Sequence, residues 1–295
     1  MKACLPATLT LGKRIVFGKE SHARSRIGTV LANTMTKTTE WSRRLVGYAL
    51  AAVSLWAGAY GASGDPLPPV VVYHRFGAVA SDGMTVRTSA FAAQLEFLKE
   101  NDFTVVPLRK IVNRVRGGNE PLPDKAVAIT VDDGHRSVYT EMLPLVRRYS
   151  IPVTLFIYPS AISNASYALT WRQLEELRQS GLFDIQSHTY WHPNFKQERR
   201  RLPAGAYRGI VRMQLVKPRQ ILARRLGINA DMLAWPFGIY DDELMAAAGE
   251  AGYVAGFTLD RRHPSPADRP LALPRYLITS GVSLREFRRL LGEAP

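Results

Sequence analysis

Two adjacent aspartates, Asp132 and Asp133, follow the apolar run AVAITV at 126–131, and Gly134 comes directly after them. Two carboxylates that point into one buried site repel each other, and burial favours their neutral forms, so the pair needs a cation or a proton to stabilise it. A divalent metal supplies such a cation, because one carboxylate can bind it while the other takes a proton from water. The alternative is a plain turn in which an aspartate caps a helix beginning near His135.

Two histidines, His188 and His192, stand four residues apart in the stretch SHTYWH. A helical turn after a strand would place both imidazoles on one side. Two histidines and one strand-end aspartate form the ligand set of hydrolytic Zn²⁺ sites, which keep one coordination position open for water or substrate. The chain's one cysteine, Cys4, lies near the amino terminus, so we expect the metal to be held by His, Asp or Glu.

The elements that must position these residues alternate in type along the chain. Short β-branched or aromatic runs are separated by stretches of helical spacing, which predicts a parallel sheet covered by helices, closed as a barrel or open and doubly wound. In such folds the active site forms at the carboxyl ends of the strands, where we expect the polar residues to meet. The strand candidates are VVVY, FTVVPL, AVAITV, PVTLFIY, FDIQS, MLAWP, YVAGFTL and RYLIT.

The amino-terminal segment carries half of the formal net charge of +14, since residues 1–61 hold nine Lys or Arg against two Glu. Residues 35–63 are typical of a signal peptide, or of an amino-terminal membrane anchor through 45–62. Residues 1–34 fit an upstream extension from a start codon assigned too early. We therefore expect an exported protein, in the periplasm, the cell envelope or the extracellular space.

The most basic part of the remaining chain is a predicted helix over 204–226, which Pro218 should kink or divide. Its charge indicates a solvated outer face or a surface that attracts an anionic polymer. Nucleic acid is not an expected partner, because no recognised binding motif accompanies the charge and the protein is predicted to be exported.

Three ordered motifs make the chain resemble the polysaccharide deacetylase family, the NodB-homology carbohydrate esterases. The resemblance runs from about Val70 to Thr279 and implies an α/β fold, a distorted (β/α)7 barrel, formed by residues 64–295 as a single domain. It also implies one divalent metal, usually zinc. The motifs are Thr130-Val131-Asp132-Asp133-Gly134, His188-Thr189-Tyr190-Trp191-His192 and Pro236-Phe237-Gly238.

Carried over from the family, Asp133, His188 and His192 would be the metal ligands, and Asp132 would be the general base. The resemblance implies a hydrolase that removes N-acetyl groups from N-acetylglucosamine units of an envelope or extracellular polysaccharide. Two alternatives stay open: an esterase of the same fold that removes O-acetyl groups, and a glycan-binding protein that has lost catalysis.

The chain departs from the commonest family pattern in two places. A late Leu-x-His motif reads Leu273-Pro274-Arg275 here, and Ala234 stands where the third motif usually has an arginine. Both changes resemble the branch that includes exported poly-N-acetylglucosamine deacetylases. In that branch an early Tyr-His supplies the general acid, which implies His74 in this chain; a hydrogen-bonded structural histidine is the alternative.

Each of the remaining site candidates could have a structural role instead of a functional one. Arg275 could pair with Asp132, hold the barrel closed, or contact the substrate. Aromatic and neighbouring residues near strand ends could form a platform for a sugar ring or could be core; they are Trp235, Pro236, Phe237, Tyr190 and Trp191. We expect His135 to begin a helix and His263 to lie on the surface.

Overall fold

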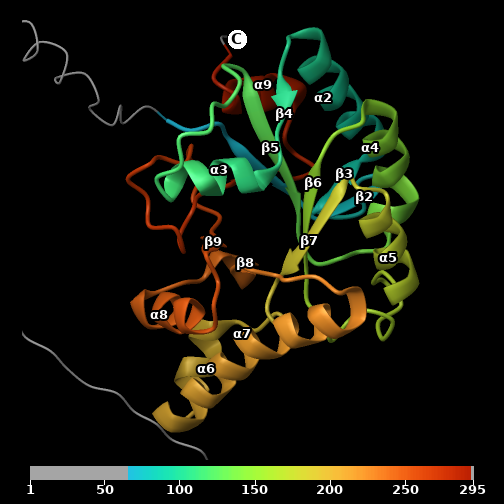
Figure 1. Ribbon diagram of the computed structural model, residues 1–295. Helices are drawn as coiled ribbons and strands as arrows, with labels where there is room; N and C mark the ends of the chain where they lie inside the picture. The colour runs from blue at the N-terminus through green and yellow to red at the C-terminus, as the bar shows by residue number, and fades with distance from the viewer. Residues whose placement is uncertain (1–65, 294–295) are drawn as a thin grey trace, which may run out of the picture. The chain divides into compact units, whose positions relative to one another are not determined.

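A computed structural model describes residues 66–293, and its main feature is one parallel β-sheet (Figure 1). Seven strands follow one path in the order β10-β1-β5-β6-β7-β8-β9, and β4 pairs with β5 beside this path. The strands are β1 (Val70–Tyr73), β4 (Thr104–Val105), β5 (Ala126–Val131), β6 (Val153–Ile157), β7 (Phe183–Ser187), β8 (Met232–Ala234), β9 (Ala255–Phe257) and β10 (Tyr276–Leu277).

All eight predicted strand runs form strands of this sheet. β1, β5 and β7 have the bounds of the predicted runs, and the other five strands are shorter than the runs. The sequence patterns missed two short strands, β2 (Arg75–Gly77) and β3 (Thr85–Arg87), which pair with each other in a separate sheet. Three residues are too few to show a period of two. This small sheet begins at Arg75, so its strand pairing fixes the chain that directly follows His74.

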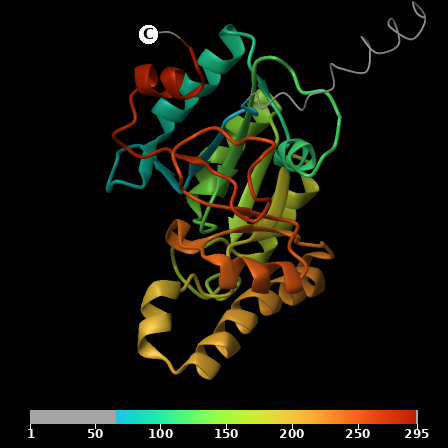
Figure 2. The ribbon, with the colours of Figure 1, turned by 90° about the vertical axis from the view of Figure 1, so that its left-hand side faces the viewer.

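The sheet curls into a half-barrel, and its two ends are joined by an irregular segment between β9 and β10 (Figure 2). One parallel bridge links Phe257 of β9 to Leu273, whose amide N–H donates to the Gly256 carbonyl oxygen at 2.7 Å. The same segment then continues into β10, which pairs with β1. The expected distorted (β/α)7 barrel architecture is therefore confirmed.

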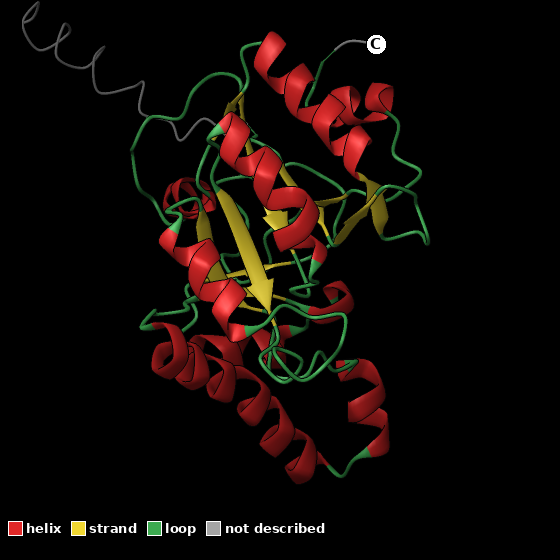
Figure 3. Cartoon of the chain, turned by 90° about the vertical axis from the view of Figure 1, so that its right-hand side faces the viewer, coloured by secondary structure: helices red, strands yellow, loops and turns green. Residues whose placement is uncertain are grey.

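Helices pack along the outside of the strands (Figure 3), and α6, α7 and α8 gather at one end of the sheet (Figure 1). Two short helical turns, η1 (Val138–Met142) and η2 (Pro236–Gly238), follow β5 and β8. The helices are α2 (Thr88–Glu100), α3 (Leu108–Val115), α4 (Leu143–Tyr149), α5 (Trp171–Gln179), α6 (Phe195–Arg201), α7 (Ala204–Leu226), α8 (Asp242–Glu250) and α9 (Leu284–Leu290).

The predicted helix over 204–226 is α7, but Pro218 does not divide it. Pro218 is itself buried, and the buried face continues on both sides of it through Leu215 and Leu222. Packing of this continuous apolar face holds both halves in one helix, although proline removes one backbone hydrogen bond.

The strands nearest the site are buried on both faces, as expected for a parallel sheet covered by helices. Every residue of β1, β5 and β6 is buried. Charged groups therefore enter this region at strand ends, and the buried Asp, Glu, His, Lys or Arg side chains among the described residues are Asp132, His188 and Arg275. All three belong to one cluster.

The predicted signal peptide or anchor at 35–63 and the upstream extension at 1–34 lie outside the described residues. Across 66–293, no helix has the length and apolar character needed to cross a membrane.

Candidate active site and metal centre

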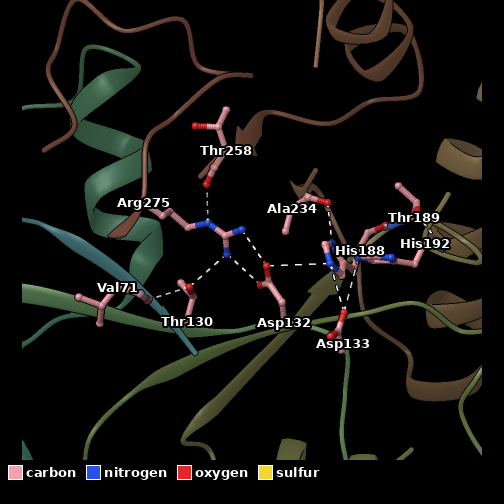
Figure 4. Close-up of polar contacts among 11 residues, drawn as sticks. Val71, Thr130, Asp132, Asp133, His188, Thr189, His192, Ala234, Thr258 and Arg275 are labelled. Carbon is pink, nitrogen blue, oxygen red and sulfur yellow. Dashed lines mark hydrogen bonds and ion pairs between the residues drawn. The ribbon is translucent and has the colours of Figure 1, made fainter. Parts of the chain in front are cut away.

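The two aspartates after β5 point toward different partners (Figure 4). Asp133 has a φ of 74° and Gly134 a φ of 73°, so the chain turns sharply behind the strand. A Cβ on Gly134 would lie 2.9 Å from the Cγ2 atom of Ile157, so glycine is required here for space as well as for conformation. The aspartate cap considered as the plain alternative is absent, because η1 has no side-chain cap in the described chain.

Asp132 forms a buried bidentate ion pair with Arg275. Each of the two guanidinium NH₂ nitrogens donates to one carboxylate oxygen at 2.8 Å, and both side chains are at most 2% exposed. Arg275 also donates to the Thr258 carbonyl oxygen and to the Thr130 hydroxyl. Burial alone would raise the pKa of Asp132, but the charge of Arg275 outweighs it and lowers this pKa. Asp132 is therefore held as a carboxylate.

Asp133, His188 and His192 bring one ligand atom each to a common point. Their candidate ligand atoms all lie within 4.8 Å of one another. The Nε2 atoms of His188 and His192 lie 3.5 and 3.7 Å from Oδ1 of Asp133. These distances are too long for good hydrogen bonds, and this buried Oδ1 has no hydrogen-bond partner within residues 66–293. The unpaired oxygen and the two imidazoles fit a divalent metal.

The states of Asp133 and His192 also fit a metal. Burial would raise the pKa of Asp133, but the neighbouring histidines, His188 first, hold it well below its usual range. Burial and then His188 lower the pKa of His192 to about 4, so this imidazole is neutral near pH 7, as metal binding requires. Burial would lower the pKa of His188, but the charges of Asp132 and Asp133 outweigh burial and raise it. The Nδ1 atom of His188 lies 2.8 Å from the Ala234 carbonyl oxygen, which turns its Nε2 toward Asp133.

His74 lies between β1 and β2, at the carboxyl end of β1. Its side chain is partly exposed, and its buried Nδ1 has no hydrogen-bond partner in the described part of the chain. Burial lowers the pKa of His74, against the opposite influence of Asp132 and Asp133. The position agrees with the expected rim of the sheet, and the general-acid role stays a prediction.

One family model matches the part of the chain that carries this cluster. Residues 119–256 match the family model described as polysaccharide deacetylase. The chain contains a polysaccharide deacetylase domain. The matched residues include Asp132, Asp133, His188 and His192, and the match ends just before β9 is complete.

Curated relatives of the deacetylase domain carry one recurring name, poly-beta-1,6-N-acetyl-D-glucosamine N-deacetylase. The Escherichia coli K12 protein is 29% identical over 238 residues, covering 69% of this chain and 35% of the relative. The Staphylococcus epidermidis protein is 25% identical over 200 residues, covering 66% of this chain and 68% of the relative. The chain thus spans about a third of the length of the first of these relatives.

Two solved structures share the fold of the deacetylase domain. Streptococcus pyogenes deacetylase PplD in complex with acetate superposes with a TM-score of 0.68 at 22% identity, covering 78% of this chain and 100% of the other. IcaB from Ammonifex degensii superposes with a TM-score of 0.66 at 24% identity, covering 77% and 98%. At these identities the likeness supports the fold alone.

The loop that carries both histidines is not helical, so the predicted helical turn is wrong. Thr189 and His192 have φ values of 65° and 62°, and the two imidazole rings lie 4.6 Å apart in an edge-on arrangement. Gln214, a fully buried residue of α7, holds this loop: its Oε1 accepts from the amide N–H groups of Tyr190 and Trp191, both at 3.0 Å. A glutamine on the apolar side of a helix was the sequence signal that could have revealed this anchor.

Replacing Gln214 by leucine is expected to weaken metal binding about ten- to hundredfold, because the two amides lose their acceptor and the histidine loop loosens. Titration of the metal-free protein with Zn²⁺, together with thermal unfolding, measures the effect. Gln220→Leu, on the exposed side of the same helix, is the control. Unchanged metal affinity in the Gln214 variant would show that the loop does not need this anchor.

Three predicted substrate contacts are contradicted by burial. Trp235 is 1% exposed, packs edge-on against Phe195, and its Nε1 donates to the Leu271 carbonyl oxygen. Pro236 is also buried. Arg275 is fully buried and occupied by Asp132, so it acts on the aspartate and cannot reach a polymer. These residues belong to the core that supports the site.

The other aromatic candidates are accessible. Phe237 is 57% exposed and packs edge-on against His192 with ring centroids 4.6 Å apart. Trp191 is 39% exposed, and the Lys217 amine lies 3.8 Å from the centre of the partly exposed Tyr190 ring. A sugar platform made of Tyr190, Trp191 and Phe237 therefore stays a prediction.

The two further histidines lie outside the ligand cluster. His135 does not begin a helix; its Nδ1 lies 2.8 Å from the Ser137 hydroxyl within the turn after Gly134. His263 is half-buried, contrary to the surface expectation, because its two ring nitrogens face the carbonyl oxygens of Leu67 and Leu290. Neither residue extends the metal site.

Proposed function

We propose that this chain is a metal-dependent polysaccharide N-deacetylase that acts on N-acetylglucosamine units of an envelope or extracellular polysaccharide. The observation that carries the proposal is an ionised, Arg275-held aspartate directly beside a buried Asp-His-His cluster. The name shared by the curated relatives supports poly-β-1,6-linked N-acetylglucosamine as the substrate class. Residues 35–63, as signal peptide or anchor, would export the protein to that substrate.

Asp133, His188 and His192 would hold the metal. Two imidazole nitrogens and one carboxylate oxygen suit several divalent ions, with Zn²⁺ the best match for a three-ligand hydrolytic site. When bound, the metal would supply a Lewis acid that polarises the acetamide carbonyl and lowers the pKa of water.

Asp132 would act as the general base. Its Oδ2 lies 4.0 Å from Nε2 of the ligand His188, so the carboxylate faces the place where substrate and water would meet. Each carboxylate oxygen accepts one hydrogen bond from Arg275 and keeps a second lone pair for a proton. Asp132 would take the proton of the attacking water, whose oxygen forms the new bond to the carbonyl carbon.

His74 would complete the reaction as the general acid. When the carbon–nitrogen bond breaks, the leaving nitrogen must receive a proton, because an amine anion is too poor a leaving group. His74 stands at the same rim as Asp132, directly after the neighbouring strand β1. The products are free acetate and a glucosamine unit in the polymer.

Replacing His74 by alanine is expected to lower kcat on an N-acetylated oligomer by about 10²- to 10⁴-fold. The same variant should lose less than about tenfold on a matching O-acetylated sugar, because an alcohol leaves more easily than an amine and depends less on the acid. Acetate release from both substrates measures the difference. Near-unchanged turnover of the N-acetylated oligomer would instead favour the O-acetyl esterase alternative.

The substrate class is tested by a panel of β-1,6- and β-1,4-linked N-acetylglucosamine oligomers, with protein that starts near Ser63. Acetate released from the β-1,6 series would support the proposal and identify the linkage. Oligomer binding that persists in chelator, with no acetate released, would favour a non-catalytic glycan-binding protein.

A further inference from the structure

Tyr158 occupies the rim position between the two ligand-bearing strands. It directly follows β6, which pairs with β5 on one side and β7 on the other. Its ring centroid lies 5.5 Å from that of His192 and 6.4 Å from that of His188. The Tyr158 side chain therefore forms a wall directly beside the ligand cluster, and the sequence motifs did not include it.

The hydroxyl of Tyr158 is paired with a second phenol. The Oη atoms of Tyr158 and Tyr167 lie 2.7 Å apart, and Tyr167 is 43% exposed. Two hydroxyls bring two hydrogens, and the bond between them uses one. Whichever tyrosine donates in the pair, one hydroxyl hydrogen remains for a partner outside it.

The segment that carries both tyrosines is fixed to the two ligand turns. The Tyr167 carbonyl oxygen accepts from the Arg136 amide at 2.7 Å, and the Leu169 amide donates to the Gly134 carbonyl oxygen at 2.9 Å. The Ser160 amide donates to the Tyr190 carbonyl oxygen at 3.1 Å, in the histidine loop. The phenol pair thus has a set position relative to the metal ligands, which lowers the entropy cost of binding a partner.

The rim offers two kinds of aromatic surface around His192. Phe237 and Trp191 present exposed carbon surface, whereas the Tyr158–Tyr167 pair presents hydroxyls. A pyranose unit has the same two characters, with C–H faces that pack on aromatic rings and hydroxyls that need hydrogen-bond partners.

We propose that the Tyr158–Tyr167 pair is a specificity-determining subsite that donates a hydrogen bond to a hydroxyl of the pyranose unit bound at the site. The inference rests on the proposed deacetylase function and adds the residues that recognise the sugar. The pair selects for carbohydrate, and the metal ligands and Asp132 act on the acetyl group whatever carries it.

The test is the double variant Tyr158→Phe/Tyr167→Phe, which removes both hydroxyls and keeps both rings against their neighbours. For an N-acetylglucosamine oligomer we expect the KM of the double variant to rise about tenfold, while its kcat stays within about twofold of the parent value. The KM of each single variant should lie between those of the parent and the double variant. Turnover of 4-nitrophenyl acetate, which has no sugar, should not change. Tyr139→Phe, which removes a phenol bonded to Glu176 away from the site, is the matched control.

Three results would overturn the inference: an oligomer KM within twofold of the parent, an equal loss on oligomer and sugar-free ester, or a fall in bound metal in the double variant. Failure of the proposed function is separate, because it shows as no acetate release by the parent protein. In that case the subsite is tested by measuring, with calorimetry, the dissociation constant of the oligomer for the parent and for the double variant. Equal dissociation constants would reject the subsite, and about tenfold weaker binding by the double variant would support it.

Discussion

Replacing Asp132 by asparagine is expected to lower kcat for acetate release by about 10²- to 10⁴-fold while the protein keeps its bound metal. Asparagine has nearly the shape of aspartate but cannot take a proton from water at neutral pH. Because Asp133, His188 and His192 supply the ligand atoms, the metal site should survive this change. Kinetics of acetate release and metal analysis of the same sample measure both parts of the prediction.

The adjacent variant Asp133→Asn is the matched control. It removes the charge of a ligand oxygen, so metal content and activity should fall together. If the Asp132 variant lost its metal and the Asp133 variant retained it, the roles of general base and metal ligand would have to be exchanged between the two residues. More than a tenth of the parent activity in Asp132→Asn would reject its role as the base.

Replacing Arg275 by methionine is expected to destabilise the protein by about 3–5 kcal/mol, because it leaves the Asp132 carboxylate buried without its partner. Arg275 also loses its bonds to Thr258 and Thr130, which hold the β10 end of the sheet against β5. Denaturant unfolding, with the midpoint and the slope determined separately, measures the change in the free energy of unfolding.

Arg262→Met provides the control for a bidentate pair at the surface. Arg262 donates to both carboxylate oxygens of Asp268, at 2.8 and 2.6 Å, but is 51% exposed, so its loss should cost about 0–1 kcal/mol. The double variant Asp132→Asn/Arg275→Met should recover part of the stability lost by Arg275→Met, because it removes the unpaired charge. Equal costs for Arg262→Met and Arg275→Met would show that burial does not set the strength of the inner pair.

Much of the architecture could be predicted because strands that are buried on both faces, such as β1, β5 and β6, are largely apolar runs. The residues after β1, β5 and β7 are where the sequence placed them, since the carboxyl ends of parallel strands share one edge. The burial of Trp235 and Pro236, which follow β8, could not be predicted from the strand pattern. Trp235 is core because Phe195 and Leu271, from distant segments, cover it.

Backbone conformation at the site was also beyond the sequence patterns. Seven non-glycine residues in the described part of the chain have positive φ, and four of them lie at this rim: Asp133, Thr189, His192 and Phe237. Such conformations cost free energy and persist where surrounding contacts impose them. Here Gln214 and the segment after β6 supply those contacts. Spacing alone therefore suggested a helical turn where the structure has a strained loop.

Acetate release from a β-1,6-linked N-acetylglucosamine oligomer by a single preparation, divided into three portions, tests the deacetylase proposal most directly. One portion is used as purified, one is treated with chelator, and one is treated and then given one equivalent of Zn²⁺. We predict release in the first portion, none in the second, and recovery in the third with one metal bound per chain. Release that continues unchanged in chelator, or no release from protein shown to hold one metal, would contradict the proposal.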